Sequence, residues 1–117
     1  MFNIVKLFKS FGHAFDGIIT LLRQEQNFRL HVLASAIVIV CGFYFEIRPW
    51  QWALLVIMIC LVFILEMINT IVERLLDVLK PRLHEYVKDI KDIMSAMVLI
   101  SALSSVAVGL IIFLPYL

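Results

Sequence analysis

Charged side chains are scarce in this sequence. Asp, Glu, Lys and Arg make up 16% of the 117 residues, whereas hydrophobic residues reach 63%. Soluble domains usually contain about 25% charged and 45–50% apolar residues. A soluble domain of this length buries only about two-thirds of its unfolded surface, so it could not hide this much apolar area. The composition therefore excludes an ordinary soluble enzyme and a disordered chain, and it predicts an integral membrane protein with one domain, residues 1–117.

Cysteine, glycine and excess positive charge are also scarce. The two cysteines lie inside apolar runs, which argues against a disulfide scaffold. None of the four glycines belongs to the phosphate-binding pattern G-x-x-x-x-G-K-[ST] or G-x-G-x-x-G. The net charge is +1, so no basic surface indicates a nucleic-acid partner. The three histidines are scattered, which argues against a zinc site.

Three long apolar runs are present instead. Residues 32–45 and 93–117 carry no charge, and residues 50–72 carry only Glu66. Crossing a bilayer takes about 20 helical residues, which the two longer runs provide and the first reaches with its flanking residues. The predicted fold is therefore all-α, with transmembrane helices over residues 30–48, 50–79 and 90–115.

The N-terminal segment has a different pattern. At 100° per residue, eight apolar side chains fall within about 120° of one another: Ile4, Leu7, Phe8, Phe11, Phe15, Ile18, Ile19 and Leu22. The opposite side carries polar residues that include Lys6, His13 and Asp16. This pattern predicts an amphipathic surface helix over residues 1–28, lying in the membrane interface. The alternative is that its apolar face packs on the other helices, and both can hold.

The basic residues predict the orientation. Four precede the first span and five lie between residues 74 and 91, but only Arg48 lies between the first two spans. No Lys or Arg follows the third span. Because cytoplasmic segments are enriched in Lys and Arg, we expect a cytoplasmic N-terminus and an external C-terminus.

A polar stripe interrupts the second span. Its members share one helix face over about 16 Å: Glu66, Asn69, Thr70, Glu73 and Asp77. A charge inside a span costs roughly 2.5–3.5 kcal/mol on insertion scales, so three acids on this face require an explanation. A metal ion is the simplest way to hold several carboxylates together. The alternative is a structural stripe that bonds helices together, with its acids paired to basic residues.

Two further polar clusters lie at the same membrane boundary. One precedes the first span and contains Glu25, Asn27, Arg29 and His31. The other precedes the third span and contains Lys88, Asp89, Lys91, Asp92 and Ser95. Acids together with a lysine suit Mg²⁺ and a polyphosphate, because Mg²⁺ takes one or two carboxylates and then phosphate oxygens. A lysine can neutralise the phosphates as a point charge.

These clusters resemble a known family. The run E-M-I-N-T-I-V-E-R-L-L-D over residues 66–77 resembles the E-x-x-N-[ST]-x-x-E-x-x-x-D signature of the prokaryotic diacylglycerol kinase family. Lys91 and Asp92, with Ser95, resemble its K-D-x-x-[SA]-A-x-V-L motif, and residues 25–31 resemble its segment before the first span. The resemblance covers residues 3–115. It implies a homotrimeric lipid kinase of the bacterial inner membrane, with active sites between subunits that bind ATP and Mg²⁺ on the cytoplasmic side.

The resemblance also implies roles for individual residues. Glu66 is the expected catalytic base on the lipid hydroxyl, and Glu25 and Glu73 are the expected metal ligands. The expected nucleotide contacts are Glu25, Glu73, Asn69, Lys91, Asp92, Arg82, His84, Lys6 and His13. The expected contacts to the lipid substrate are Glu66, Asn27, Phe28, Arg29, Leu30, His31 and Ser95.

The family has two substrate branches. Residues 27–31, N-F-R-L-H, resemble the undecaprenol branch, whereas diacylglycerol enzymes tend to carry an acid at the position of His31. Undecaprenol is therefore the favoured substrate, and diacylglycerol, which would give phosphatidic acid, is the alternative. A small transport or proton-conducting protein is an alternative of another class. It would need polar groups through the whole membrane, and residues 52–65 contain no Asp, Glu, His, Lys or Arg.

Overall fold

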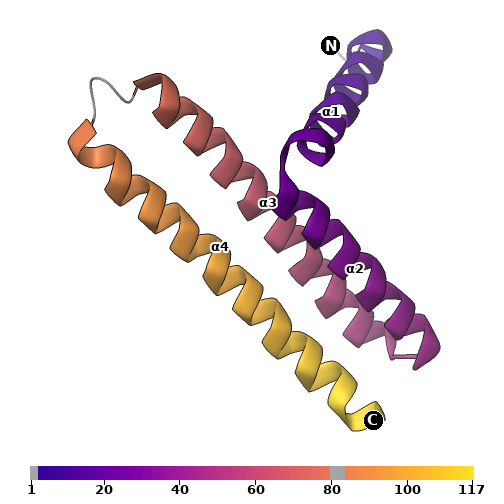
Figure 1. Ribbon diagram of the computed structural model, residues 1–117. Coiled ribbons are helices and arrows are strands. Elements are labelled where there is room, and N and C mark those ends of the chain that lie inside the picture. Colours follow the sequence, from indigo (N-terminus) through magenta and orange to yellow (C-terminus); the bar gives the residue numbers. More distant parts are fainter. Residues whose placement is uncertain (1–2, 80–83) are drawn as a thin grey trace.

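The computed structural model describes residues 3–79 and 84–117, which are helical almost throughout (Figure 1). The elements are α1 (Ile4–Gln24), α2 (Gln26–Tyr44), α3 (Pro49–Leu79), α4 (His84–Phe113) and a short 3-10 helix, η1 (Leu114–Tyr116). The described part of the chain contains no strand. α2, α3 and α4 are each long and apolar enough to cross a membrane. The predictions of an all-α fold and of three such helices are confirmed.

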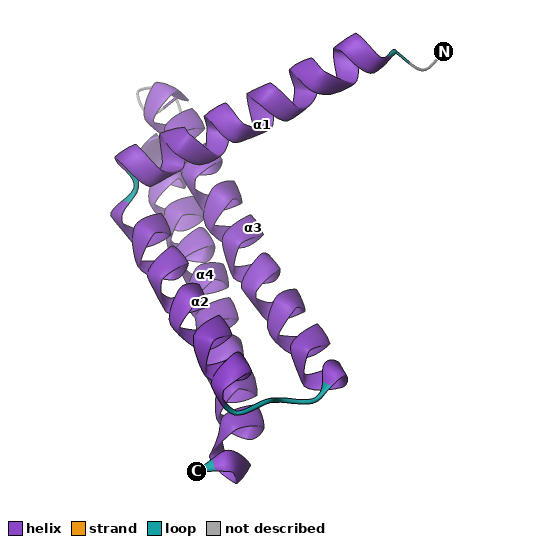
Figure 2. Cartoon of the chain, turned by 90° about the vertical axis from the view of Figure 1, so that its right-hand side faces the viewer, coloured by secondary structure: helices purple, strands orange, loops and turns teal. Residues whose placement is uncertain are grey.

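α1 is joined to α2 by a sharp elbow. Asn3 begins α1, because its Oδ1 accepts a hydrogen bond from the backbone N–H of Val5 at 3.0 Å. Glu25 is extended, with φ −112° and ψ 111°, and separates the two helices. As a result α1 projects steeply from the other helices (Figure 2). Its apolar side chains are largely uncovered, and Phe8 and Phe15 are 71% and 63% exposed.

The turn between α2 and α3 provides hydrogen-bond donors to the last backbone carbonyls of α2. The N–H of Ile47 donates to Gly42 O at 3.2 Å, and the N–H of Glu46 donates to Phe43 O at 3.3 Å. This is a Schellman motif, which needs a left-handed residue where glycine is usual. Glu46 fills that position with a φ of 51°. Pro49 then begins α3, where its missing N–H costs nothing.

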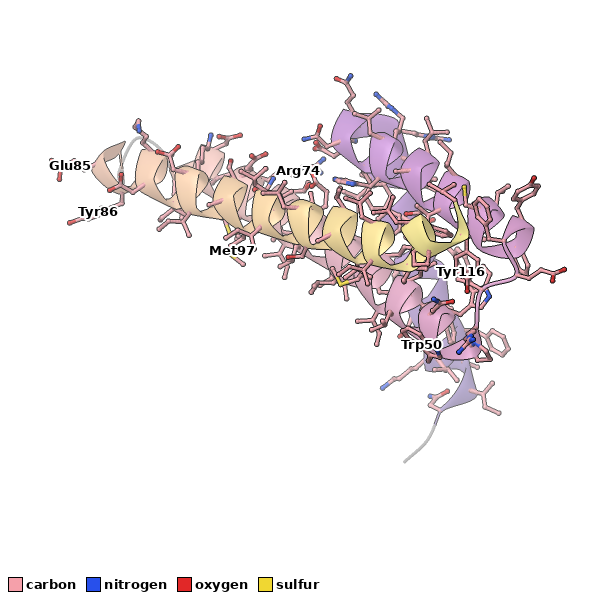
Figure 3. The ribbon with its side chains drawn as sticks, turned by 90° about the horizontal axis from the view of Figure 1, so that it is seen from below. Trp50, Arg74, Glu85, Tyr86, Met97 and Tyr116 are labelled. Carbon is pink, nitrogen blue, oxygen red and sulfur yellow. The ribbon has the colours of Figure 1, made fainter. Side chains whose placement is uncertain are left out.

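A hydrophobic core lies beside this turn. The core there contains Ile47, Leu55 and Ile112. The buried Gln51 ties the end together, because its Oε1 accepts from Tyr116 Oη at 2.7 Å and from Arg48 N at 2.9 Å. Gly42 lets the Trp52 indole approach the backbone, since a Cβ at residue 42 would lie 2.6 Å from the ring. Trp50 and Tyr116 mark this end in Figure 3.

α3 is the central helix and contacts both α2 and α4. Its 31 residues span about 46 Å by helical rise. The hydrocarbon core of a bilayer is only about 30 Å thick, so a helix of this length extends beyond it. The polar stripe occupies the half of α3 that is farther from the packed turn. The candidate site is therefore built at the opposite end from the apolar core.

Candidate active site

The site is centred on Glu66, which is the least exposed polar residue among those described, at 2%. His31 of α2 lies beside it, with Nε2 3.6 Å from Glu66 Oε2. That oxygen has no hydrogen-bond partner within the described part of the chain. A buried carboxylate oxygen without a partner is costly, so its retention suggests a use other than stability.

Two further acids lie near Glu66. Glu25 at the elbow and Glu73 on α3 both act electrostatically on its carboxylate. Glu25 Oε1 lies 3.3 Å from Arg74 Nη2, and the same nitrogen donates to Gln24 Oε1 at 2.6 Å. Arg74 therefore holds the elbow against α3. It also places Glu25, which belongs to the polar cluster before the first span, beside the polar stripe of α3.

Glu73 has an amide as its neighbour. Asn69 Nδ2 donates to Glu73 Oε1 at 3.4 Å. This leaves Asn69 Oδ1 buried without a partner among the residues that the structure describes. No group of three or more His, Cys, Asp or Glu side chains in residues 3–79 and 84–117 converges as a closed metal site. Mg²⁺ needs only one or two carboxylates when phosphate and water complete its shell, so Glu25 and Glu73 fit a metal shared with a substrate.

α4 brings the third cluster to the stripe. Lys91 Nζ lies 3.0 Å from Asp77 Oδ1 of α3. Lys88 Nζ lies 2.9 Å from Asp92 Oδ2 one turn along α4, and Ser95 is exposed one turn beyond. Exposed ion pairs of this kind contribute only about 0–1 kcal/mol, so a phosphate can readily displace either partner.

The other residues of the segment before the first span have structural partners or are exposed. Phe28 is 3% exposed and packs on Phe63 of α3 with ring centroids 5.2 Å apart. Arg29 Nη1 donates to the carbonyls of residues 22 and 23 at 3.1 and 3.0 Å, which closes the C-terminal end of α1. Asn27 and Leu30 are exposed.

Two of the remaining predicted site residues, Lys6 and His13, are not brought to this cluster. Lys6 and His13 are exposed on α1, whose N-terminal part projects away from the helices that carry the acids. Arg82 lies outside the described residues. His84 is the first residue of α4.

Sequence reasoning missed Arg74. Its position directly after Glu73, beside the acidic stripe, was the available signal. Spacing along one helix did not reveal its contact with Glu25, which lies 49 positions away in the sequence. Spacing along α3 likewise did not reveal the contact of Asp77 with Lys91, which comes from the next helix.

Comparison with known proteins relates this arrangement to an enzyme family. Residues 12–113 match the family model described as prokaryotic diacylglycerol kinase. An undecaprenol kinase of Bacillus subtilis is 38% identical over 110 residues, which cover 94% of this chain and 89% of the relative. A diacylglycerol kinase of Synechocystis sp. is 33% identical over 110 residues, covering 93% of this chain and 63% of the relative. A diacylglycerol kinase of Helicobacter pylori is 30% identical over 95 residues, covering 81% and 74%. This chain therefore belongs to the prokaryotic diacylglycerol kinase family and is a lipid kinase, a phosphotransferase that acts on an alcohol.

Proposed function

We propose that this lipid kinase transfers a phosphoryl group from ATP to the hydroxyl of undecaprenol, with Mg²⁺ as its metal. The observation that carries this proposal is the 38% identity to an undecaprenol kinase over nearly the full length of both chains. His31 supports it, because diacylglycerol enzymes of the family tend to carry an acid at this position. Here the position lies beside the buried Glu66. Diacylglycerol is the second candidate, since the relative at 33% identity is named a diacylglycerol kinase.

Glu66 is proposed as the base that accepts the proton of the lipid hydroxyl. Its carboxylate is buried, and it lies seven residues before Glu73, about 10 Å along the helix axis. A lipid alcohol keeps its hydroxyl near the membrane boundary, whereas ATP approaches from water. A polar stripe that crosses this boundary can orient both reactants, which is the main requirement for phosphoryl transfer.

Glu25 and Glu73 are proposed to hold Mg²⁺, with Asn69 supporting them through its partnerless Oδ1. When bound, the metal neutralises charge on the phosphates of ATP. The side chain of Arg74 must then release Glu25, which places a free guanidinium beside the same phosphates. Lys91 and Asp92 are proposed to contact the nucleotide from α4 after leaving their present ion pairs.

Further contacts rest on the family resemblance. Lys6, His13, Arg82 and His84 are proposed as nucleotide contacts. The lipid substrate is proposed to lie against Asn27, Leu30, His31, Ser95 and Glu66, while Phe28 and Arg29 hold this segment in place through their contacts with α3 and α1.

The arrangement in the membrane is also a proposal. Residues 1–28 lie in the interface as an amphipathic helix, and residues 30–48, 50–79 and 90–115 cross the inner membrane. Exposed apolar side chains on α1 support an interfacial position. The distribution of Lys and Arg supports a cytoplasmic N-terminus and active site with an external C-terminus. The family resemblance supports a homotrimer with active sites between subunits.

A parallel kinase assay tests the substrate. Undecaprenol and diacylglycerol are supplied in the same detergent with labelled ATP and Mg²⁺, and label in extracted lipid is measured. We expect kcat/KM for undecaprenol to exceed that for diacylglycerol by about tenfold or more, a difference of ~1.4 kcal/mol. The reverse ratio would make diacylglycerol the substrate. Transfer to neither lipid would refute the proposed function.

A further inference from the structure

Arg74 joins the polar stripe of α3 to the elbow. Its Nη2 lies 3.3 Å from Glu25 Oε1 and donates to Gln24 Oε1 at 2.6 Å. Glu25 and Arg74 are 49 positions apart in the sequence, and Arg74 is labelled in Figure 3. By helical periodicity Arg74 lies about 80° around α3 from Glu66, at the edge of the stripe. Its guanidinium therefore reaches from the stripe to the elbow.

Arg74 is also the counter-charge of a group of acids. Glu25 and Glu73 both act electrostatically on Glu66. Of these three carboxylates, only that of Glu25 is ion-paired with a Lys or Arg side chain among the described residues, and its partner is Arg74. One fixed positive charge thus lies beside three acids.

The carboxylate oxygen that Arg74 contacts belongs to a proposed metal ligand. Glu25 Oε1 lies within ion-pair distance of the guanidinium. Two positive charges at one oxygen repel each other, so this oxygen binds either the guanidinium or a divalent cation. Arg74 and the cation therefore compete for Glu25.

The ion pair of Arg74 is one that separates readily. The Arg74 side chain is 50% exposed and that of Glu25 is 30% exposed. An ion pair with this exposure is worth at most about a factor of five in an equilibrium constant. A cleft with a volume of about 480 Å³ lies between α1 and α3, and Arg74 lines it together with Thr20 and Thr70. The guanidinium therefore has open space beside it and can leave Glu25 without displacing a packed side chain.

A guanidinium that leaves Glu25 at this place suits a phosphate. Arginine binds phosphate oxygens through two parallel N–H groups. MgATP carries a net negative charge, which the carboxylates of Glu25, Glu66 and Glu73 would repel. A cation released beside them offsets that repulsion.

We propose that Arg74 exchanges partners: it competes with the divalent cation for Glu25, and it binds a phosphate of ATP once Glu25 has turned to the metal. The proposal rests on the proposed kinase function and adds a regulation of its metal site. Arg74 weakens the binding of a divalent cation alone but strengthens the binding of cation and nucleotide together. The elbow stays joined to α3 throughout, because Glu25 and Glu73 hold the same metal after Arg74 has left.

Two binding constants of Arg74→Gln test the exchange. Binding of Mn²⁺ alone, followed by electron paramagnetic resonance of the free ion, should tighten by about fivefold because the competing charge is gone. Binding of MgATP should weaken by about tenfold or more, because a charge-assisted hydrogen bond to a phosphate is lost. Arg74→Lys should restore the Mn²⁺ constant and part of the MgATP constant, since lysine keeps the charge but lacks the planar fork of donors.

Gln24→Ala gives a second signature of the competition. It leaves the charge of Arg74 in place and removes one of the two acceptors that hold it. Mn²⁺ alone and MgATP should then each bind about twofold more tightly. Arg23→Gln is the control, because Arg23 is exposed in the last turn of α1 and pairs with no acid among the described residues. Neither constant should change in it at physiological salt.

Weaker binding of both Mn²⁺ and MgATP in Arg74→Gln would make Arg74 a structural clamp and overturn the proposal, as would two unchanged constants. Weaker binding of either ligand in Gln24→Ala would also overturn it. Circular dichroism and thermal unfolding establish that each variant is folded, and Gln24→Ala carries the test if Arg74→Gln does not fold. These constants are measured without lipid, so the kinase assay is independent of them: transfer to neither lipid would refute the proposed function and leave the constants as they are.

Discussion

Replacement of Glu66 by glutamine separates chemistry from nucleotide binding. Glutamine has nearly the same size as glutamate but cannot accept a proton. The Glu66 side chain is buried beside His31, and a neutral amide is no more costly to bury there than a carboxylate. We therefore expect the variant to fold and to unfold at a similar temperature.

The expected loss follows from the position of Glu66. It lies about 10 Å along α3 from Glu73 by helical rise, so it is not expected to share the metal ion that Glu73 is proposed to hold. MgATP binding should therefore be retained. Loss of a general base typically lowers the rate by 10²–10⁴-fold, so kcat should fall by at least about a hundredfold, or ~2.7 kcal/mol of activation free energy.

Single-turnover transfer of label to lipid and equilibrium binding of MgATP give the two measurements. Ser101→Ala provides the control, because Ser101 is also a buried polar residue of a spanning helix, at 4% exposure, but bonds only to the backbone of its own helix. Near-normal turnover in Glu66→Gln would show that Glu66 is not the base. Loss of MgATP binding with lipid binding intact would place it in the nucleotide site.

Three further predictions concern metal, topology and the turn. Glu25→Gln and Glu73→Gln should each raise the Mg²⁺ concentration needed for half-maximal activity and lower turnover, as a titration of activity with Mg²⁺ would show; unchanged metal dependence in both would make these acids structural. In a variant without native cysteines, a cysteine at Arg48 should react with an impermeant maleimide added outside the cell, and one at Lys88 should not; the opposite pattern would reverse the orientation. Glu46→Gly should stabilise the folded protein by about 1 kcal/mol, because glycine adopts the left-handed φ of 51° without the Cβ clash; a lower unfolding temperature would contradict this.

The sequence by itself determined that this is a membrane protein, and it determined which residues share the polar face of α3. Apolar runs of sufficient length predict spanning helices because a bilayer offers no hydrogen-bond partners to the backbone. The spacing of Glu66, Asn69 and Glu73 places them on one face because an α-helix repeats every 3.6 residues. These inferences concern single helices, whose geometry is local. The motif resemblance added the family, which the comparisons confirm.

Partners between helices were decided by the tertiary structure. The contacts of Glu66 with His31 and of Asp77 with Lys91 join different helices, and the contact of Glu25 with Arg74 joins the elbow to α3. Local periodicity says which face a residue occupies but not which helix covers that face. That choice depends on how side chains pack between helices and on the elbow and turn that set their directions. The cleft beside Arg74 has the same origin, since residues of α1 and α3 line it only where the elbow brings these two helices together.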